Sequence, residues 1–423
     1  MSRCEKHPQA PALLACSLAR FFALACLALC SVACDSSAIP TSQGTGKPIE
    51  RGALLLLASD YRSTNLSVRT ATLELLTGSL FSTGSHAAGL SYALSGDVAI
   101  SSESLATGAD VALLDRYGTN VLTYVNPATG LVRAQLAVGT GFESNPQDIL
   151  PWNDSKAFIS RYGVDPQPGD APFDGGSDLI VVDPRVPAIV GRIPFVDKAG
   201  VPARPSALTR HGEHAVVTLQ RLSHDFSAAL DGDLALVRGE SLEVEQVLPL
   251  PNLRNCGKAV FSQAGKLAIA CSGLFDSQTT RFGKEGAAII VATLETTGVV
   301  IEERWNAAAL NVSPAGHVAW VSETTLVFDS YGSGQTGDAL YTLHRGDPSA
   351  REIYRARKPF TIGALRCSSG AFTRCRATVA EPRFVLDITG DLLHHSATAT
   401  EHSAADITGL PLRGLGIFDV TTP

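Results

Sequence analysis

The feature that most constrains the fold of this chain is a pattern of strands and turns that recurs about every 50 residues. Each unit contains a polar turn with a residue suited to positive φ, followed by an alternating or apolar strand. We predict that this turn joins the first two strands of each unit. The turn residues are Gly52, Gly96, Asp154-Ser155, Gly212, Gly265, Gly316 and Gly370.

A second element recurs between these turns, and it consists of an apolar strand, a tight polar turn and another strand. It is clear at 122–138, 179–195, 234–250 and 288–305, and looser at 68–82 and 339–355. Each unit therefore holds four strands. Self-similarity at this period predicts the blades of a β-propeller rather than a solenoid. No segment keeps a helical periodicity over 12 residues.

Counting the units predicts an all-β fold, a seven-bladed β-propeller of four-stranded antiparallel blades. A single four-stranded sheet leaves apolar faces exposed, and a closed ring buries these faces between neighbouring blades. The segment 414–420, "GLGIFDV", could complete a blade begun at the N-terminus or finish the last blade. The units span 52–82, 92–139, 145–195, 204–250, 255–305, 306–356 and 362–420.

The N-terminal segment differs from the repeats and is typical of an export signal. Basic residues precede an apolar run from Phe21 to Cys34 that ends in small residues. We therefore predict a cleaved signal peptide at 1–33, a flexible polar tether at 34–50 and a propeller domain at 51–423. A boundary between two separate β domains near Gly200-Val201-Pro202 is the alternative organisation.

The residues Ser31-Val32-Ala33-Cys34 resemble the cleavage site of bacterial lipoproteins, in which the cysteine becomes the lipidated first residue. The departure is Ser31, where that family usually has leucine. The resemblance implies lipidation at Cys34 and a place in the bacterial cell envelope, facing the periplasm or the cell surface. Plain secretion with cleavage nearby is the alternative.

Composition limits the partners of the chain. The net charge of −7 argues against a nucleic-acid partner, because phosphate binding needs a basic face. No apolar stretch after residue 34 reaches the roughly 20 residues that span a bilayer. We expect a monomer that contacts the membrane only through its N-terminal lipid.

Four cysteines follow the leader, and an even number in an exported protein suggests disulfides. Cys256 and Cys271 flank a turn almost symmetrically, as do Cys367 and Cys375. Such residues face each other across a hairpin, so we predict the bonds Cys256–Cys271 and Cys367–Cys375. The alternatives are free thiols or a four-cysteine metal site, although no Cys-x-x-Cys spacing favours zinc.

The segment 113–163 resembles the YVTN-type repeat of bacterial β-propellers in its "YVNPATG", "LAVG", "AFIS" and "RYG" elements. The segment 177–195, "SDLIVVDPRVPAIVGRIPF", is a second match, and the literal signature of the family is absent. The resemblance implies the propeller fold and little about activity.

Four connections between the second and third strands of their units are long, and all should lie on one face of the ring. Long loops on a rigid scaffold are common binding sites. We name this surface the long-loop face and expect it to bind a small-molecule ligand or a protein partner. The loops span 161–178, 220–233, 273–286 and 328–338.

Two groups of residues are candidate metal ligands. Asp165, Asp170 and Asp174 are spaced carboxylates that could coordinate Ca²⁺, without the spacing of a calcium loop. Asp178 recurs as Asp233 and Asp338 at strand starts, which favours a turn role for these three residues.

The last unit gathers His394, His395 and His402, and histidine suits metal binding and acid–base catalysis. His394 and His395 point to opposite faces if they lie in a strand, so a polar surface is the alternative. His211 and His214 fit a solvated turn better than a zinc site, because they lack a helical face that aligns them.

We therefore predict an exported, lipid-anchored propeller that serves as a binding protein or scaffold, with no cofactor. The alternative is an enzyme of the lactonase type, or a metal-dependent hydrolase, with its site at the central channel. No Gly-x-Ser-x-Gly nucleophile motif and no phosphate-binding loop occur in the chain.

Overall fold

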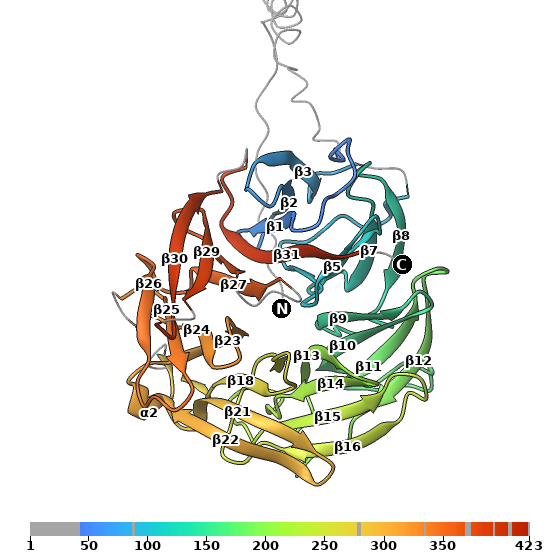
Figure 1. Cartoon of the computed structure of the whole chain (residues 1–423). Coiled ribbons are helices and arrows are strands. Elements are labelled where there is room, and N and C mark those ends of the chain that lie inside the picture. The colour runs from blue at the N-terminus through green and yellow to red at the C-terminus, as the bar shows by residue number, and fades with distance from the viewer. Residues whose placement is uncertain are drawn as a thin grey trace, which may run out of the picture. The chain divides into compact units, whose positions relative to one another are not determined.

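Six four-stranded antiparallel sheets and one sheet of four antiparallel strands with a short fifth strand added in parallel are arranged around a common axis in this structure, a computed structural model (Figure 1). The structure describes residues 43–86, 89–276, 281–333, 336–368, 374–391, 394–404 and 408–421. Each sheet is one blade of a β-propeller, so the predicted fold class is confirmed. Cys34 and the predicted signal peptide lie outside the described residues.

In each of the first three blades, the strands lie side by side in the order that the repeats predict, from the innermost strand at the axis to the outermost strand. The first blade combines β31 (Leu412–Thr421), β1 (Leu54–Ser59), β2 (Thr64–Arg69) and β3 (Leu75–Ser82). The second holds β4 (Val98–Ile100), β6 (Val111–Asp115), β7 (Val121–Val125) and β8 (Val132–Ala137). The third holds β9 (Pro146–Asn153), β10 (Lys156–Val164), β11 (Gly176–Asp183) and β12 (Ala188–Pro194).

The fourth and fifth blades repeat the same arrangement. The fourth holds β13 (Pro205–His211), β14 (His214–Leu219), β15 (Asp233–Arg238) and β16 (Val244–Pro249). The fifth holds β17 (Val260–Phe261), β18 (Leu267–Ser272), β21 (Ala287–Glu295) and β22 (Gly298–Asn306). Its long loop forms a small hairpin from β19 (Phe275–Asp276) and β20 (Arg281–Phe282).

The last two blades return the chain to its start. The sixth holds β23 (Pro314–Trp320), β24 (Thr325–Ser330), β25 (Ala339–His344) and β26 (Arg351–Arg355). The seventh holds β27 (Ile362–Cys367), β28 (Arg374–Val379), β29 (Phe384–Asp391) and β30 (Ser396–Ser403). Within the described part of the chain, helix is limited to the single turn α2 (Ala307–Leu310). None of the described helices is long and apolar enough to cross a membrane.

The ring closes through β31, which pairs antiparallel with β1 and becomes the innermost strand of the first blade. Of the two placements that the sequence left open for 414–420, the structure has the one that completes the N-terminal blade. On its other edge β31 pairs in parallel with β5 (Leu105–Thr107), a short strand inserted between β4 and β6.

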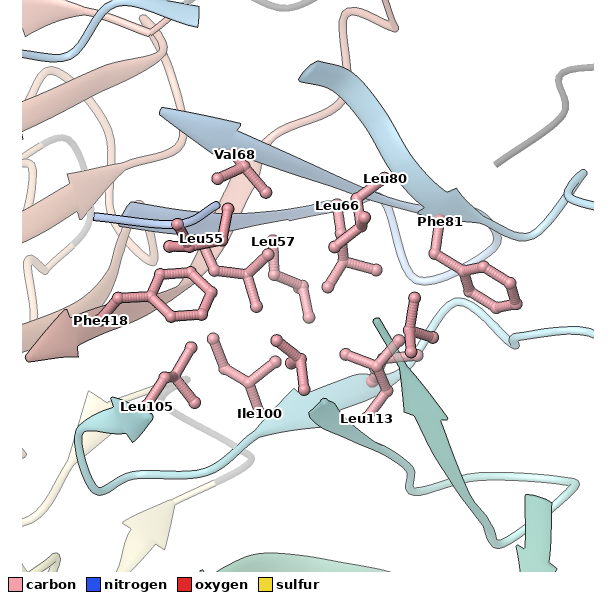
Figure 2. Close-up of a cluster of buried hydrophobic side chains, with 14 of the residues drawn as sticks. Leu55, Leu57, Leu66, Val68, Leu80, Phe81, Ile100, Leu105, Leu113 and Phe418 are labelled. Carbon is pink, nitrogen blue, oxygen red and sulfur yellow. The ribbon is translucent and has the colours of Figure 1, made fainter. Parts of the chain in front are cut away.

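Seven clusters of buried apolar side chains hold the ring together, one between each pair of neighbouring blades. Figure 2 shows the cluster between the first two blades, where Leu55 and Phe418 face Ile100 and Leu113. Burial between blades is the closure mechanism that the repeats predict. The cluster between the third and fourth blades includes Ala203, so the core is continuous across 200–202.

The segment before β1 belongs to this body. Gln43 N donates to Ser79 O at 3.1 Å, Thr45 N donates to Pro127 O at 3.0 Å, and Ile49 is buried. Residues 43–49, which the sequence assigns to the tether, therefore pack on the first two blades.

Three of the predicted turns lie elsewhere, and Gly370 lies outside the described residues. Gly52 precedes β1, which is the second strand of its blade because β31 is the first. Gly96 precedes β4 and lies between the first two blades, rather than between two strands of one blade. Gly316 lies inside the innermost strand β23, where the pairing register shifts between Pro314 and Val318. Its φ of +104° is a bulge conformation, which glycine adopts as readily as a turn. The turns at Asp154-Ser155, Gly212 and Gly265 join first and second strands as predicted.

Candidate functional site

The largest candidate site is a cavity of about 550 Å³ on the axis of the ring. Tyr61, Tyr331 and Phe360 line it from loops that join second to third strands or one blade to the next. These are the loops of the long-loop face, so the cavity opens on that face. A second cavity of about 250 Å³ lies toward the opposite face and is lined by Arg210, Trp320 and other side chains.

The four residues Ser102, Lys258, His317 and Arg366 line both cavities and therefore lie at their boundary. Lys258 Nζ donates to Ser102 O and Ser102 Oγ, each at 2.9 Å, and to Glu103 Oε1 at 2.7 Å. Ser102 belongs to the second blade and Lys258 to the loop before the fifth, so this contact reaches across the ring. It forms the floor of the larger cavity.

Asp148 supports this floor from the third blade and is almost fully buried. Its carboxylate accepts hydrogen bonds from Ser102 Oγ at 2.5 Å and from Leu208 N at 2.9 Å. Burial raises the pKa of Asp148, and the charge of Lys258 opposes that rise. Asp148 therefore positions Ser102 and links three blades.

His317 reaches the boundary from the bulge in β23. His317 Nδ1 lies 2.5 Å from Asp329 Oδ2, and His317 N donates to Asp329 Oδ1 at 2.9 Å. The Asp329 side chain is buried, whereas that of His317 is about one-third exposed. The carboxylate thus fixes the orientation of the imidazole beside the cavity.

Arg366 differs from Lys258 and Arg116, two other cations of the cavity, because it has no carboxylate partner among the described residues. Its Nη1 donates to Leu365 O at 3.2 Å, and its Nε is buried without a hydrogen-bond partner. Burial lowers the pKa of Arg366, and the charges of Asp148 and Glu103 oppose this effect. An arginine keeps its charge in proteins, so Arg366 presents at the floor a cation that has no carboxylate partner among the described residues.

A second such guanidinium lies nearer the mouth. Arg413 Nη1 donates to Phe360 O at 2.8 Å, and its Cζ lies 5.1 Å from the centroid of the Tyr61 ring. Its Nε is also buried and has no hydrogen-bond partner among the described residues. By contrast, Arg116 is paired with Asp97. The cavity lining carries four Lys and Arg side chains and two carboxylates. It is locally positive in a chain whose net charge is −7.

The predicted calcium ligands lie in the long loop of the third blade and serve local turns. Asp165 Oδ1 accepts from Gln167 N at 2.8 Å, and Asp174 Oδ2 accepts from Gly169 N at 3.2 Å. Asp170 is exposed. In the described part of the chain, no three His, Cys, Asp or Glu side chains are grouped to hold a metal. The calcium site stays a prediction.

The recurring aspartates have a role more specific than a turn. Asp178 accepts from Arg161 at 2.8 and 2.7 Å, and Asp233 accepts from Arg221 at 2.7 Å. Asp338 instead accepts four backbone N–H bonds, including one from Thr361 at 2.6 Å. All three are buried carboxylates that anchor the base of a long loop.

The histidines of the last blade are dispersed. His394 Nδ1 lies 2.7 Å from Asp391 Oδ2, and the His395 ring packs against His344 with centroids 4.1 Å apart. His402 lies in β30 opposite Val385. The structure does not bring His394, His395 and His402 into one cluster. In the opening turn of the fourth blade, His211 stacks on Phe261 and His214 lies 2.7 Å from Glu245.

The structure contains the disulfides Cys256–Cys271 and Cys367–Cys375, as expected. The second joins facing positions of β27 and β28, whereas Cys256 precedes β17 and faces Cys271 of β18 through an isolated bridge. Sequence reasoning missed the cavity residues Lys258, His317 and Arg366, and Arg413. They come from separate repeats, and a bulge removes the strand alternation that would have placed His317.

Comparison with known proteins supports the fold alone. No protein-family model matches the chain, and no curated protein sequence does. The periplasmic gluconolactonase of Pseudomonas aeruginosa superposes with a TM-score of 0.54 at 11% identity, over 86% of this chain and 98% of that one. A putative 6-phosphogluconolactonase from Bacteroides uniformis gives a TM-score of 0.53 at 10% identity, over 86% and 98%.

A dihydro-heme d1 dehydrogenase gives a TM-score of 0.51 at 14% identity, over 90% of this chain and 78% of that one. Proteins of different activity therefore share this architecture, and such low identities carry no function from one to another.

Proposed function

We propose that this protein binds a small anionic molecule in the axial cavity, with entry from the long-loop face. The observation that carries the proposal is Arg366, a half-buried guanidinium at the cavity floor without a carboxylate partner among the described residues. A buried unpaired charge is costly, and a bound carboxylate or phosphate would supply the missing partner.

The test is calorimetric titration of the purified protein with acetate, gluconate and inorganic phosphate at fixed ionic strength. Arg366→Gln is expected to weaken the binding of any anion that binds by tenfold or more, because a charged hydrogen bond contributes about 1.5–3 kcal/mol. Arg351→Gln on the exposed strand β26 is the matched control and should leave binding unchanged. Equal affinities of wild type and Arg366→Gln would reject the proposal.

A second candidate is hydrolysis of an ester or lactone at the same boundary. The observation that favours it is the His317–Asp329 pair, in which a buried carboxylate orients an imidazole beside the cavity. This pairing is the arrangement that a general base uses to take a proton from water. Two of the similar structures are described as lactonases, one of them putative.

Turnover of glucono-δ-lactone at a rate that His317→Gln lowers at least 100-fold would support the enzyme. If the protein binds anions but does not turn over the lactone, the enzyme proposal is rejected and the binding function is retained.

We also propose that the chain is exported, that Cys34 is lipidated, and that its repeats are of the YVTN type. The basic and apolar leader and the two disulfides support export, because disulfides persist in oxidising compartments. Cys34→Ala is expected to release the mature protein from membranes into the soluble fraction. Unchanged membrane attachment of this variant would exclude the anchor.

A further inference from the structure

Two guanidinium groups of the cavity lining, those of Arg366 and Arg413, have no carboxylate partner among the described residues, and their positions indicate where the anionic groups of a ligand would bind. Resting on the proposed function, we infer that the ligand carries two separated anionic groups, one bound by Arg366 at the floor and one by Arg413 at the mouth. The chemical class is an extended dianion, such as a dicarboxylate.

The two arginines lie at different depths on adjacent innermost strands. Arg413 belongs to β31 and Arg366 to β27, and both strands run from the long-loop face toward the opposite face. Gly363 of β27 lies beside Arg413 of β31, because a Cβ at Gly363 would be 2.5 Å from Arg413 O and 2.7 Å from Arg413 Cα. Arg366 follows three residues later, which places its backbone roughly 10 Å deeper at about 3.3 Å per residue.

Both guanidinium groups have donors to spare. A guanidinium carries five N–H donors, and each of these two makes a single hydrogen bond to a backbone carbonyl among the described residues. Their Nε atoms are covered by protein, so the Nη donors are those that a ligand would meet. The two other cations of the cavity lining, Lys258 and Arg116, are neutralised by Glu103 and Asp97.

The cavity as a whole suits a polar chain. Its lining includes the amides of Gln147, Gln220 and Asn255, and the rings of Tyr61, Tyr331 and Phe360. A compact dianion would reach only one guanidinium, whereas a dianion with charges several bonds apart could reach both. Each guanidinium can bind a carboxylate through two parallel hydrogen bonds.

The experiment compares adipate, which has a carboxylate at each end, with hexanoate, which has the same number of carbons and one carboxylate. Binding of each is measured by calorimetry at one ionic strength, because surface electrostatics change with salt. We expect wild type to bind adipate at least tenfold more tightly than hexanoate. Arg413→Gln should lower adipate affinity to that of hexanoate and leave hexanoate unchanged, and Arg366→Gln should weaken both.

Arg413→Lys separates charge from folding, since it keeps the cation and the contact with Tyr61. It should retain most of the preference for adipate, and Arg351→Gln should retain all of it. Equal wild-type affinities for adipate and hexanoate would overturn the two-anion inference while leaving the proposed anion site in place. No binding of either molecule, or of the anions named above, would overturn the proposed function itself.

Discussion

The buried ion pair at the base of the third blade's long loop gives the sharpest stability prediction. Asp178 accepts two hydrogen bonds from Arg161, at 2.8 and 2.7 Å, and one from Arg192 at 2.5 Å. The Arg161 and Asp178 side chains are fully buried. Arg161 also donates to Phe173 O at 2.6 Å and to Thr140 Oγ1 at 2.7 Å. One carboxylate therefore holds the strands and the loop together.

Replacing Asp178 with Asn removes this carboxylate and leaves two guanidinium groups opposite a neutral amide. Breaking a buried pair by removing one partner costs about 3–5 kcal/mol, and we expect a loss of that size in the free energy of unfolding. Urea denaturation measures it, as the shift in midpoint multiplied by the slope. Limited proteolysis should show faster cleavage within 165–175, because the anchored base of this loop loosens.

Glu213→Gln is the control, since the exposed pair of Glu213 with Arg238 should contribute less than about 1 kcal/mol. A loss for Asp178→Asn no larger than that of the control would refute the reasoning. If millimolar Ca²⁺ restored the free energy of unfolding of Asp178→Asn to that of wild type, the reasoning would also be refuted. The carboxylate would then act through a metal rather than through the arginines.

Three further outcomes can be measured. The hydrogen bond from Lys266 is the main cause that lowers the pKa of Glu302 to about 2. The ionised Glu302 therefore stabilises the fold at pH values above the ordinary pKa of a glutamate, and this contribution is lost as the pH falls toward 2. Glu302→Gln should therefore reduce the urea midpoint at pH 7 and match wild type near pH 2; an equal difference at both values would contradict this. Replacing Cys256 and Cys271 by Ala should cost about 3 kcal/mol for a 15-residue loop, and reductant should lower the melting temperature of wild type more than that of the variant. Deleting 412–423 should abolish the cooperative thermal transition, because the first blade loses its innermost strand; a preserved transition would show that closure is dispensable.

The fold could be predicted because its determinants are local and repeated. Hairpin turns such as the one at Gly212, and paired cysteines such as Cys256 and Cys271, leave their marks within about 20 residues of sequence. The long loops of the third to sixth blades also follow from strand order alone, since every connection from second to third strand leaves the same face. Burial between blades then accounts for the seven clusters.

The site could not be predicted to the same extent, because its residues meet only when the ring closes. Lys258, Arg366 and Arg413 are far apart in sequence, and their approach depends on the angle between blades rather than on any motif. Gly316 is an example of a local pattern that the sequence does not resolve. A glycine with positive φ occurs both in a bulge and in a hairpin turn, so the sequence does not distinguish the two. The partners of two aspartates were easier to predict, since Asp178 follows Arg161 near the end of β10, and Asp233 follows Arg221 just after β14.

The position of β31 has a consequence for how the molecule is made. The first three strands of the first blade leave the ribosome before the other six blades, yet the strand that covers their inner edge emerges only after the seventh blade. Until then, Leu55 and Leu57 have only part of their final packing, and the backbone of β1 has an open edge to which other chains could add. The first blade therefore cannot be completed until β31 has been made, and until then the edge of β1 is open to pairing with another chain.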